Sequence, residues 1–312
     1  MTSNIATSHT WDFATDETPR LILDAHYADV TVHHDGGPGQ TTVTLTARKE
    51  IDVAAIEARS YGRDVQLVIP ALAPAERENA GWASQLGNLL IGAVRGVGLT
   101  LDVHLPEGAE LDLKVRGGDI TVVGRSGNLR ARTGGGDVRF GDAEQVTVHT
   151  GGGDIRASRA TQGALDTGGG DISIGSLGEG RLTSGGGDVS VEALGSGAIR
   201  TGGGDIRVGR TEGDVTVATG AGDVQLDGCL GTTDVNTGAG DVRVHVTSGR
   251  LNVRSGLGDI TVTVPEGVPV WQDLSSPLGD VSSRLGARGE PSEGQAHIVV
   301  AARTGTGDVT LS

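Results

Sequence analysis

The sequence predicts an all-β fold, a single-stranded parallel β-solenoid with about 17–18 residues per coil. The peptide Thr-Gly-Gly-Gly-Asp-Ile, or a close variant of it, recurs through the C-terminal two thirds of the 312-residue chain. Runs in which apolar and polar residues alternate flank each copy, which is typical of strands with one buried face. The aspartates that mark the copies are mostly 17 or 18 residues apart, and so short a period indicates stacked coils. They are Asp119, Asp137, Asp154, Asp171, Asp188, Asp205, Asp223, Asp241, Asp259, Asp280 and Asp308.

Each coil reads as a strand, a glycine corner and a second strand. A path of 17–18 residues at roughly 3.3 Å each is about 57 Å long, which fits two or three short strands and leaves no room for a helical crossover. The residue two before each corner Thr or Ser is apolar: Ala131, Val148, Leu165, Leu182, Ile199, Val217, Val235 and Val253. The residue after each Asp is Val or Ile: Val138, Ile155, Ile172, Val189, Ile206, Val224, Val242 and Ile260. Two further on the residue is again apolar: Phe140, Ala157, Ile174, Val191, Val208, Leu226, Val244 and Val262. We expect these positions to form interior ladders.

The corners carry the most regular polar residues of the chain. Recurring glycines predict a backbone with positive φ, and the recurring Thr or Ser is expected to bond turn amides. Three hypotheses account for the aspartates. The carboxylates accept turn N–H groups while Arg139, Arg156, Arg207 and Arg243 offset their charge; or they bind calcium between coils; or they form a catalytic cluster. The calcium motif has a different glycine spacing, and an Asp in every coil is as frequent as the fold itself, so the sequence favours the first hypothesis.

Composition restricts the class of partner. The formal net charge is −15, and Lys49 and Lys114 are the only lysines. Without a basic stripe to displace counterions from phosphates, nucleic-acid binding and contact with an acidic membrane surface are disfavoured. Aromatic residues make up 2% of the chain and glycines number 54, so small aliphatic ladders must replace an aromatic-rich core.

The single cysteine and the first residues bear on the compartment. Cys229 cannot form an internal disulfide, and Gly228-Cys229-Leu230-Gly231 reads as a small buried or corner position rather than a nucleophile. Residues 1–10 contain neither the basic region nor the apolar stretch of a secretory signal. We therefore expect a cytoplasmic protein.

Three regions follow from the pattern: an N-terminal arm at 1–19, a β-rich N-terminal cap of degenerate coils at 20–115, and the regular Gly-Asp solenoid at 116–312. Within the cap, residues 28–32 resemble a degenerate coil. Residues 81–98 break the β pattern with apolar residues at helical spacing. This insertion is expected to cover an end or side of the solenoid, and the alternative is an interfacial anchor or a helix that docks a partner.

Other candidate chemistry is weak. Asp166-Thr167-Gly168 matches an aspartic-protease triplet, but its Thr-Gly belongs to the repeat and no second triplet occurs. His33 and His34, with His26 nearby, would point to opposite faces of a strand, as a surface pair does, rather than form a metal site. The sequence therefore indicates a protein that is not an enzyme, with no catalytic, cofactor-binding or metal-binding residues and no cofactor.

The corners from Gly117-Gly118-Asp119-Ile120 to Gly258-Asp259-Ile260 resemble the DUF4097 β-strand-repeat family, whose members are often labelled adhesins. The resemblance covers roughly residues 20–312. It implies a β-solenoid from a bacterium with no assigned catalytic residues, and a link to envelope stress responses. An adhesin would also need an export signal or anchor.

These observations predict a non-enzymatic structural or interaction protein, a scaffold for protein contact or self-association. The chain reaches a last corner at residues 304–309, so an unpaired β edge is expected there and would be offered to a neighbour. Alternatively, the long gap between Asp280 and Asp308 folds back as a plug. An adhesin-like or carbohydrate-binding surface protein is the second hypothesis, and a carbohydrate-active β-helix enzyme is the third.

Overall fold

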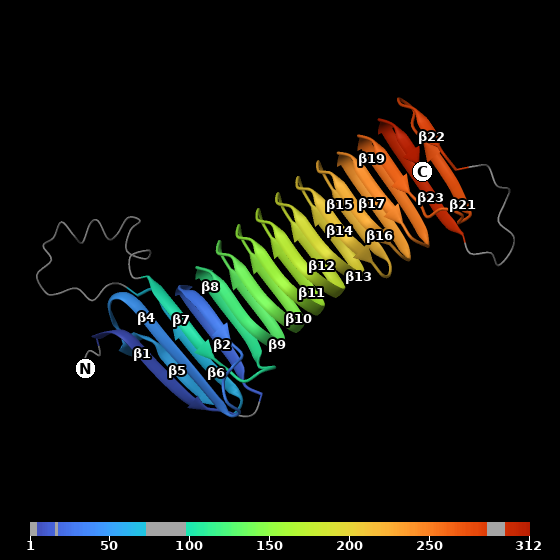
Figure 1. The fold of residues 1–312 in the computed structure, drawn as a ribbon. Helices are drawn as coiled ribbons and strands as arrows, with labels where there is room; N and C mark the ends of the chain where they lie inside the picture. The colour runs from blue at the N-terminus through green and yellow to red at the C-terminus, as the bar shows by residue number, and fades with distance from the viewer. Residues whose placement is uncertain (1–4, 16–17, 73–97, 286–296) are drawn as a thin grey trace, which may run out of the picture. The chain divides into compact units, whose positions relative to one another are not determined.

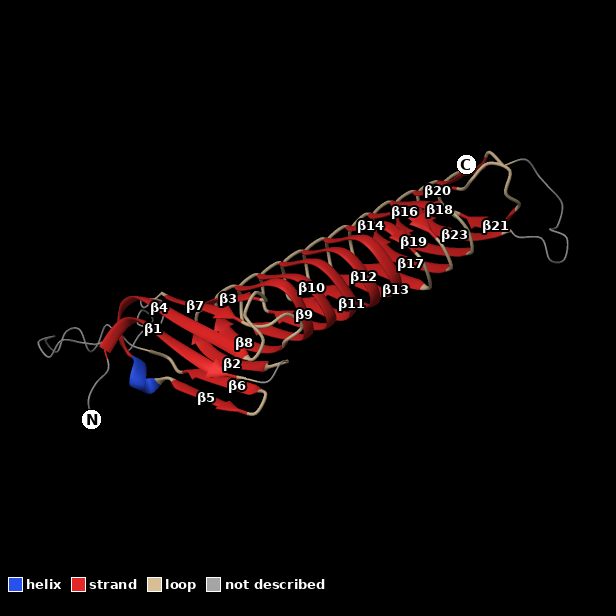
Figure 2. Ribbon diagram, turned by 60° about the horizontal axis from the view of Figure 1, so that its bottom comes forward, coloured by secondary structure: helices blue, strands red, loops and turns tan. Residues whose placement is uncertain are grey.

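The computed structural model describes residues 5–15, 18–72, 98–285 and 297–312. Within these residues the chain forms strands, with a single 3-10 turn at Val53–Ala55 (Figure 2). Two compact units divide the chain, Met1–Asp154 and Ile155–Ser312. The predicted insertion at 81–98 lies outside the described residues except for Gly98, and the predicted region boundaries stay predictions.

Unit 1 is a stack of strands in two layers with the core between them. Strands that follow a corner form the post-corner layer, in the order β10-β9-β3-β7-β4-β1, and strands that precede a corner form the pre-corner layer, in the order β10-β9-β8-β2-β6-β5. The long strands β9 and β10 contribute to both layers. The strands are β1 (Ile5–Ala14), β2 (Arg20–Tyr27), β3 (Asp29–His33), β4 (Gln40–Asp52), β5 (Glu57–Tyr61), β6 (Asp64–Ile69), β7 (Leu99–His104), β8 (Glu110–Gly117), β9 (Ile120–Thr133) and β10 (Val138–Thr150).

The first coil of unit 1 does not lie at its end. β2 and β3 form a coil that sits between the β6–β7 coil and the β8–β9 coil. The Val30 N–H donates to Asp119 O at 2.8 Å, so residues 28–32 are a degenerate coil, as predicted. Beyond the β6–β7 coil, β4 and β1 extend the post-corner layer antiparallel, and β5 extends the pre-corner layer antiparallel. Antiparallel strands therefore end the parallel stack at this end of the unit.

Unit 2 is the regular solenoid, with coils stacked in parallel register (Figure 1). The first three coils are single bent strands that cross both layers, and later coils use one strand in each layer. The strands are β11 (Ile155–Thr167), β12 (Ile172–Ser184), β13 (Val189–Thr201), β14 (Ile206–Thr211), β15 (Val215–Thr219), β16 (Val224–Cys229), β17 (Thr232–Ala239), β18 (Val242–Val246), β19 (Arg250–Leu257), β20 (Ile260–Thr263), β21 (Val270–Ser275), β22 (Val281–Ser283), β23 (Ile298–Thr306) and β24 (Val309–Leu311).

The predicted apolar ladders form the core. Each residue of the column that follows the corner aspartates is paired with its counterpart in the next coil and is at most 2% exposed: Ile155, Ile172, Val189, Ile206, Val224, Val242, Ile260 and Val309. The column two residues before the corners is buried in the same way. Of the residues that the sequence assigned to the three apolar columns, Ala157 is half-buried and the others are buried. Parallel strands buried on their inner face therefore account for the Val and Ile content.

The last coils of unit 2 are out of chain order. We call residues 270–283, which include β21 and β22, the outer coil, and residues 298–311, which include β23 and β24, the closing coil. β23 lies between β19 and β21, and β24 lies between β20 and β22, with every pairing parallel. The outer coil thus comes first in the sequence, and the closing coil that follows it lies between the outer coil and the coil of β19 and β20. The predicted free edge at residues 304–309 is wrong, because the outer coil covers it.

The positive φ predicted for the corner glycines occurs in some corners and not in others. Gly240 and Gly258 have positive φ, 134° and 125°, but the three-glycine corners do not. At Gly204 a β-carbon would overlap the carbonyl oxygen of Gly187 in the preceding coil. Close stacking of neighbouring corners, rather than backbone handedness, excludes side chains at this position.

Candidate functional site

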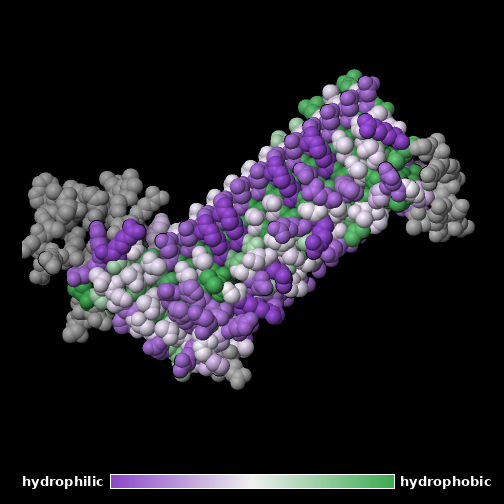
Figure 3. All heavy atoms as spheres, viewed as in Figure 1, coloured by the Kyte–Doolittle hydropathy of each residue, from purple (hydrophilic) through white to green (hydrophobic). Residues whose placement is uncertain are grey.

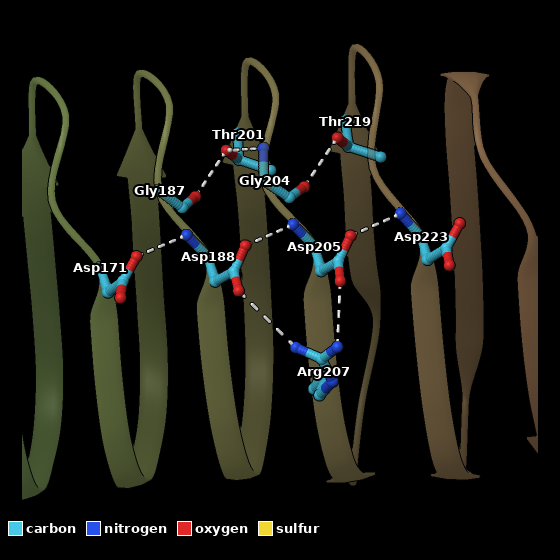
Figure 4. A network of polar contacts seen from close by, with 9 residues as sticks. All are labelled: Asp171, Gly187, Asp188, Thr201, Gly204, Asp205, Arg207, Thr219 and Asp223. Atoms are coloured by element: carbon cyan, nitrogen blue, oxygen red, sulfur yellow. Dashed lines mark hydrogen bonds and ion pairs between the residues drawn. The ribbon is translucent and has the colours of Figure 1, made fainter.

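A ladder of aspartates runs along the corners of unit 2 (Figure 4). Oδ1 of each Asp accepts the backbone N–H of the Asp one coil on, at 2.9 Å from Asp188 to Asp171, 2.8 Å from Asp205 to Asp188 and 3.0 Å from Asp223 to Asp205. The same contact then links Asp241, Asp259, Asp308 and Asp280 in that spatial order. Hydrogen bonds to an ionised acceptor are among the stronger ones in proteins. The predicted role as N–H acceptor is confirmed, with the donor supplied by the neighbouring coil.

Arginine and threonine complete the corner. Nη2 of Arg207 lies 3.0 Å from Oδ2 of Asp205, and its Nη1 lies 3.8 Å from Oδ2 of Asp188. Oγ1 of Thr201 donates to Gly187 O at 2.9 Å and accepts the Gly204 N–H at 3.2 Å. Each buried hydroxyl therefore joins two coils, and each guanidinium offsets part of the carboxylate charge.

The ladder is a structural element of the fold. Its Oδ1 atoms are engaged by backbone N–H groups, which leaves them poorly placed to coordinate calcium. In the part of the chain that the structure describes, no three or more His, Cys, Asp or Glu side chains are grouped to hold a metal ion. The corner aspartates therefore link each coil to the next through the backbone.

A histidine and aspartate cluster lies on the outer face of the post-corner layer of unit 1. The rings of His33 and His104 are stacked with their centroids 5.0 Å apart, since β3 and β7 are paired in register. Nε2 of His33 lies 3.2 Å from Oδ1 of Asp102, and Nδ1 of His104 lies 2.7 Å from Oδ1 of Asp35. Parallel imidazole planes do not direct two nitrogen lone pairs at one ion. The cluster is thus a set of polar contacts on the surface, and only the register of β3 and β7 could have predicted that Asp102 and His104 lie beside His33.

His34 points away from that cluster and fastens a crossover. Nδ1 of His34 lies 3.0 Å from Pro106 O and Nε2 lies 2.9 Å from Ser126 Oγ. Pro106 belongs to the connection from β7 to β8 that passes over the β2–β3 coil. Burial lowers the pKa of His34 below its ordinary value, with smaller opposing effects from the Pro106 carbonyl, Glu107 and Asp35. The neutral ring therefore joins three segments of unit 1.

Cys229 is buried in unit 2, as predicted. Burial raises the pKa of its thiol, and Thr233 and Thr211 partly oppose that shift. A protonated, enclosed thiol is a poor nucleophile. Asp166, of the protease-like triplet, is exposed on the outside of the solenoid.

Unit 1 also contains a hollow of about 540 Å³ beside its corners. Tyr27, Arg116, Asp29 and Asp119 line it together with corner glycines. Both carboxylates already accept a backbone N–H of a neighbouring corner. The two carboxylates are therefore part of the hydrogen bonding between corners.

Among the described residues of unit 2, regular pairing stops at the outer coil. β21 pairs with β23 and β22 pairs with β24, and among the described residues no strand pairs with their other edges. We call these two unpaired edges the outer edge. An exposed strand edge presents unsatisfied N–H and C=O groups to a partner strand. The outer edge is therefore the candidate interaction surface.

Apolar side chains are exposed near this edge (Figure 3). Leu278 is 73% exposed, Trp271 50% and Val281 46%, and Leu257, on the far side of the closing coil, is 56% exposed. Val281 continues the buried Ile260–Val309 column, so its exposure marks the end of the core.

Polar residues close the interior beneath the outer edge. In the outer coil the inward positions change from Val300 to Gln272 and from Leu311 to Ser283. Oγ of Ser283 donates to Oε1 of Gln272 at 2.9 Å, which joins the two layers. The last coil is thus stable without burial of a large apolar face, a usual property of terminal repeats.

Taken together, these features define a parallel β-solenoid repeat protein whose last coil in space has, among the described residues, unpaired outer edges. The family model Toastrack DUF4097 matches residues 77–312, and the chain belongs to this family. No curated protein matches the sequence. Within the described residues, no helix has the length and apolar character needed to cross a membrane.

Several solved structures are similar to the chain. A "putative adhesin" from Parabacteroides distasonis is 12% identical with a TM-score of 0.37, over 98% of this chain and 97% of that one. A "putative adhesin" from Parabacteroides merdae is 8% identical with a TM-score of 0.39, over 98% and 96%. A "putative lipid binding protein" from Parabacteroides distasonis is 10% identical with a TM-score of 0.32, over 98% and 97%.

Proposed function

We propose that this protein is a non-enzymatic interaction protein, a β-solenoid scaffold that binds a protein partner through the outer edge. The observation that carries the proposal is the pair of free edges on β21 and β22. Both layers end at the same coil, so a partner can add a strand to each of them. Strand addition obtains affinity from main-chain hydrogen bonds and specificity from alternate side chains.

The hydrogen bonds of β22 show which backbone groups are free. Val309 donates its N–H to Asp280 O at 2.9 Å, and Arg284 donates to Leu311 O at 2.9 Å. Alternate residues of a strand face opposite edges, so residues 280, 282 and 284 face β24. The N–H and C=O groups of Val281 and Ser283 therefore face outward, where a partner strand can bond them.

The rest of the molecule supports a binding role over catalysis. Its most repeated polar groups, the corner Asp and Thr, are engaged in coil-to-coil hydrogen bonds. The His33–His104 cluster is paired within itself, and Cys229 is enclosed. No set of nucleophile, base and orienting group converges among the described residues.

Site-specific photo-crosslinking in the native host tests this proposal. Ser282 on β22 and Ser190 on β13 occupy equivalent outward positions, since their columns are linked by register from coil to coil. A photoreactive residue at position 282 is expected to capture protein, whereas the same residue at position 190 is expected to capture little. Equal capture at both positions, or none at 282, would reject the outer edge as the contact site.

A further inference from the structure

We infer that the outer edge binds a second copy of this chain, in an end-to-end dimer whose two-fold axis runs through both layers near Ser282 and Gln272. This inference rests on the proposed function and names its partner. Three features of the outer coil carry it: the direction of its free backbone groups, the positions of two unpaired charges, and the alignment of its two strands.

The backbone of β22 suits antiparallel pairing with itself. Val281 and Ser283 face outward, and Ser282 lies midway between them. A two-fold axis at Ser282 places Val281 opposite Ser283 of the second copy, and each such pair exchanges two N–H···O bonds, as hydrogen-bonded antiparallel pairs do. The axis generates this pair twice, so this short strand contributes four backbone hydrogen bonds to the contact.

The same register is complementary in charge. It places Asp280 opposite Arg284 of the second copy, and the axis repeats this pair. Asp280 is the last member of the ladder in the described part of the chain: its N–H donates to Asp308, and no described coil lies beyond it to donate to its own Oδ1. Arg284 is exposed, and neither side chain forms an ion pair with another residue that the structure describes. Two ion pairs across the axis would therefore form without breaking any contact of the single chain.

The pre-corner layer is aligned to pair at the same time. Ile298 donates its N–H to Pro269 O at 2.9 Å, so the alternate residues Val270, Gln272 and Leu274 face the outer edge. The Gln272–Ser283 hydrogen bond places the middle of β21 across the core from β22. An axis normal to the layers through Ser282 therefore passes close to Gln272, and β21 meets its counterpart antiparallel as well.

The side chains of the outer edge suit a reversible contact. Val270, Leu274 and Val281 would continue the aliphatic interior into the second copy, while Gln272 and Ser283 keep each separate end soluble. The described strands of the outer edge carry one further charge, Asp273, which is already paired with Arg303 at 2.6 Å. Like charges therefore do not face each other in this isologous contact, in which residue i of one copy meets residue j of the other and j meets i.

Charge exchange tests the inference on the full-length protein. Sedimentation velocity over a concentration series is expected to show a monomer–dimer equilibrium for the parent protein. Asp280→Arg and Arg284→Asp each turn two attractions into two repulsions, and each is expected to weaken dimerisation by about tenfold or more. An equimolar mixture of the two variants restores opposite charges at both positions, so a heterodimer is expected at the parent affinity.

The control and the other outcomes separate this inference from the proposed function. Arg200→Asp makes the same charge change on an exposed, unpaired arginine of β13 and is expected to leave the dimer unchanged. A strict monomer at all concentrations, or a dimer indifferent to both variants and to their mixing, would overturn the inference. If the monomer still crosslinked other proteins from position 282, the outer edge would remain a binding site for a different partner. If position 282 captured nothing, the proposed function would fall as well.

Discussion

The backbone N–H of Asp308 donates to Oδ1 of Asp259 at 2.8 Å across 49 positions of sequence. Asp280, which lies between them in the sequence, is bound on the far side of Asp308. This relationship shows that the aspartate ladder follows spatial order rather than chain order. It also shows that the closing coil, inserted between two others, holds the outer coil in place.

Removal of the closing coil is expected to release the outer coil. Truncation after residue 297 takes away the strands that pair with β21 and β22, and uncovers Leu251, Val253 and Ile260. Hydrogen exchange should then show loss of protection in β21 and β22 with protection retained in β14 to β17. A synthetic peptide of residues 297–312 should restore it. Undiminished protection of the outer coil in the truncated chain would contradict the insertion.

The aspartate ladder is expected to stabilise each coil it joins. Asp205→Ala removes the acceptor of the Asp223 N–H and should lower the free energy of unfolding by about 1–3 kcal/mol, while Asp205→Asn should cost less because it keeps an acceptor oxygen. Asp280→Ala is the matched control, since no backbone N–H of the described residues donates to its side chain. Chemical denaturation below the dimerisation range measures all three. Equal losses at positions 205 and 280 would argue against the ladder.

Two adjacent glycines are expected to respond in opposite ways to the same substitution. A β-carbon at Gly204 meets the Gly187 carbonyl, whereas one at Gly203 has no heavy atom within 4 Å. Gly204→Ala should therefore destabilise the protein by roughly 2 kcal/mol or more, because a rigid stack must shift. Gly203→Ala should be neutral or stabilise by about 0.4–1 kcal/mol through the unfolded chain. Thermal melts of the two variants provide the comparison, and equal melting temperatures would exclude the steric explanation.

Acidification is expected to weaken unit 1 through His34. Because burial lowers the pKa of His34 below its ordinary 6.5, the folded protein binds this proton less readily than the unfolded chain. The stabilisation is complete above pH 6.5 and is lost as the pH falls through the lowered pKa. His34→Gln keeps a donor and an acceptor but does not titrate. Below pH 6.5 the free energy of unfolding of the parent should therefore fall relative to that of the variant. A difference between the two that does not change with pH would contradict a lowered pKa for His34.

The repeating part of the fold was predictable because each residue type has one purpose in every coil. The columns that contain Val138 and Ile199 were identified as buried from sequence and are buried in the structure. The order of the terminal coils was not predictable. The β2–β3 coil and the closing coil carry the same local pattern as their neighbours, and a period says which residues share a column but not which coil is adjacent to which.

The candidate surface was predictable only in kind. A free edge at the C-terminal end follows from the repeat, but its location at residues 304–309 is wrong because the longer gaps before Asp280 and Asp308 conceal a change of order. The sequence signal for the end of the stack was the presence of polar residues, Gln272 and Ser283, at positions that are apolar in the adjoining closing coil. The predicted cytoplasmic location and the link to bacterial envelope stress stay predictions.

The inserted closing coil also bears on synthesis at the ribosome. A solenoid whose coils are in chain order can add each coil as it leaves the ribosome. The outer coil, in contrast, lacks its native neighbour until the closing coil, residues 298–311, has also left the ribosome. At typical translation rates the 28 residues between Asp280 and Asp308 take roughly one to six seconds. During that interval the nascent chain exposes the edge of β19 and β20. Chaperone binding or premature pairing with another nascent chain would therefore concentrate at this step.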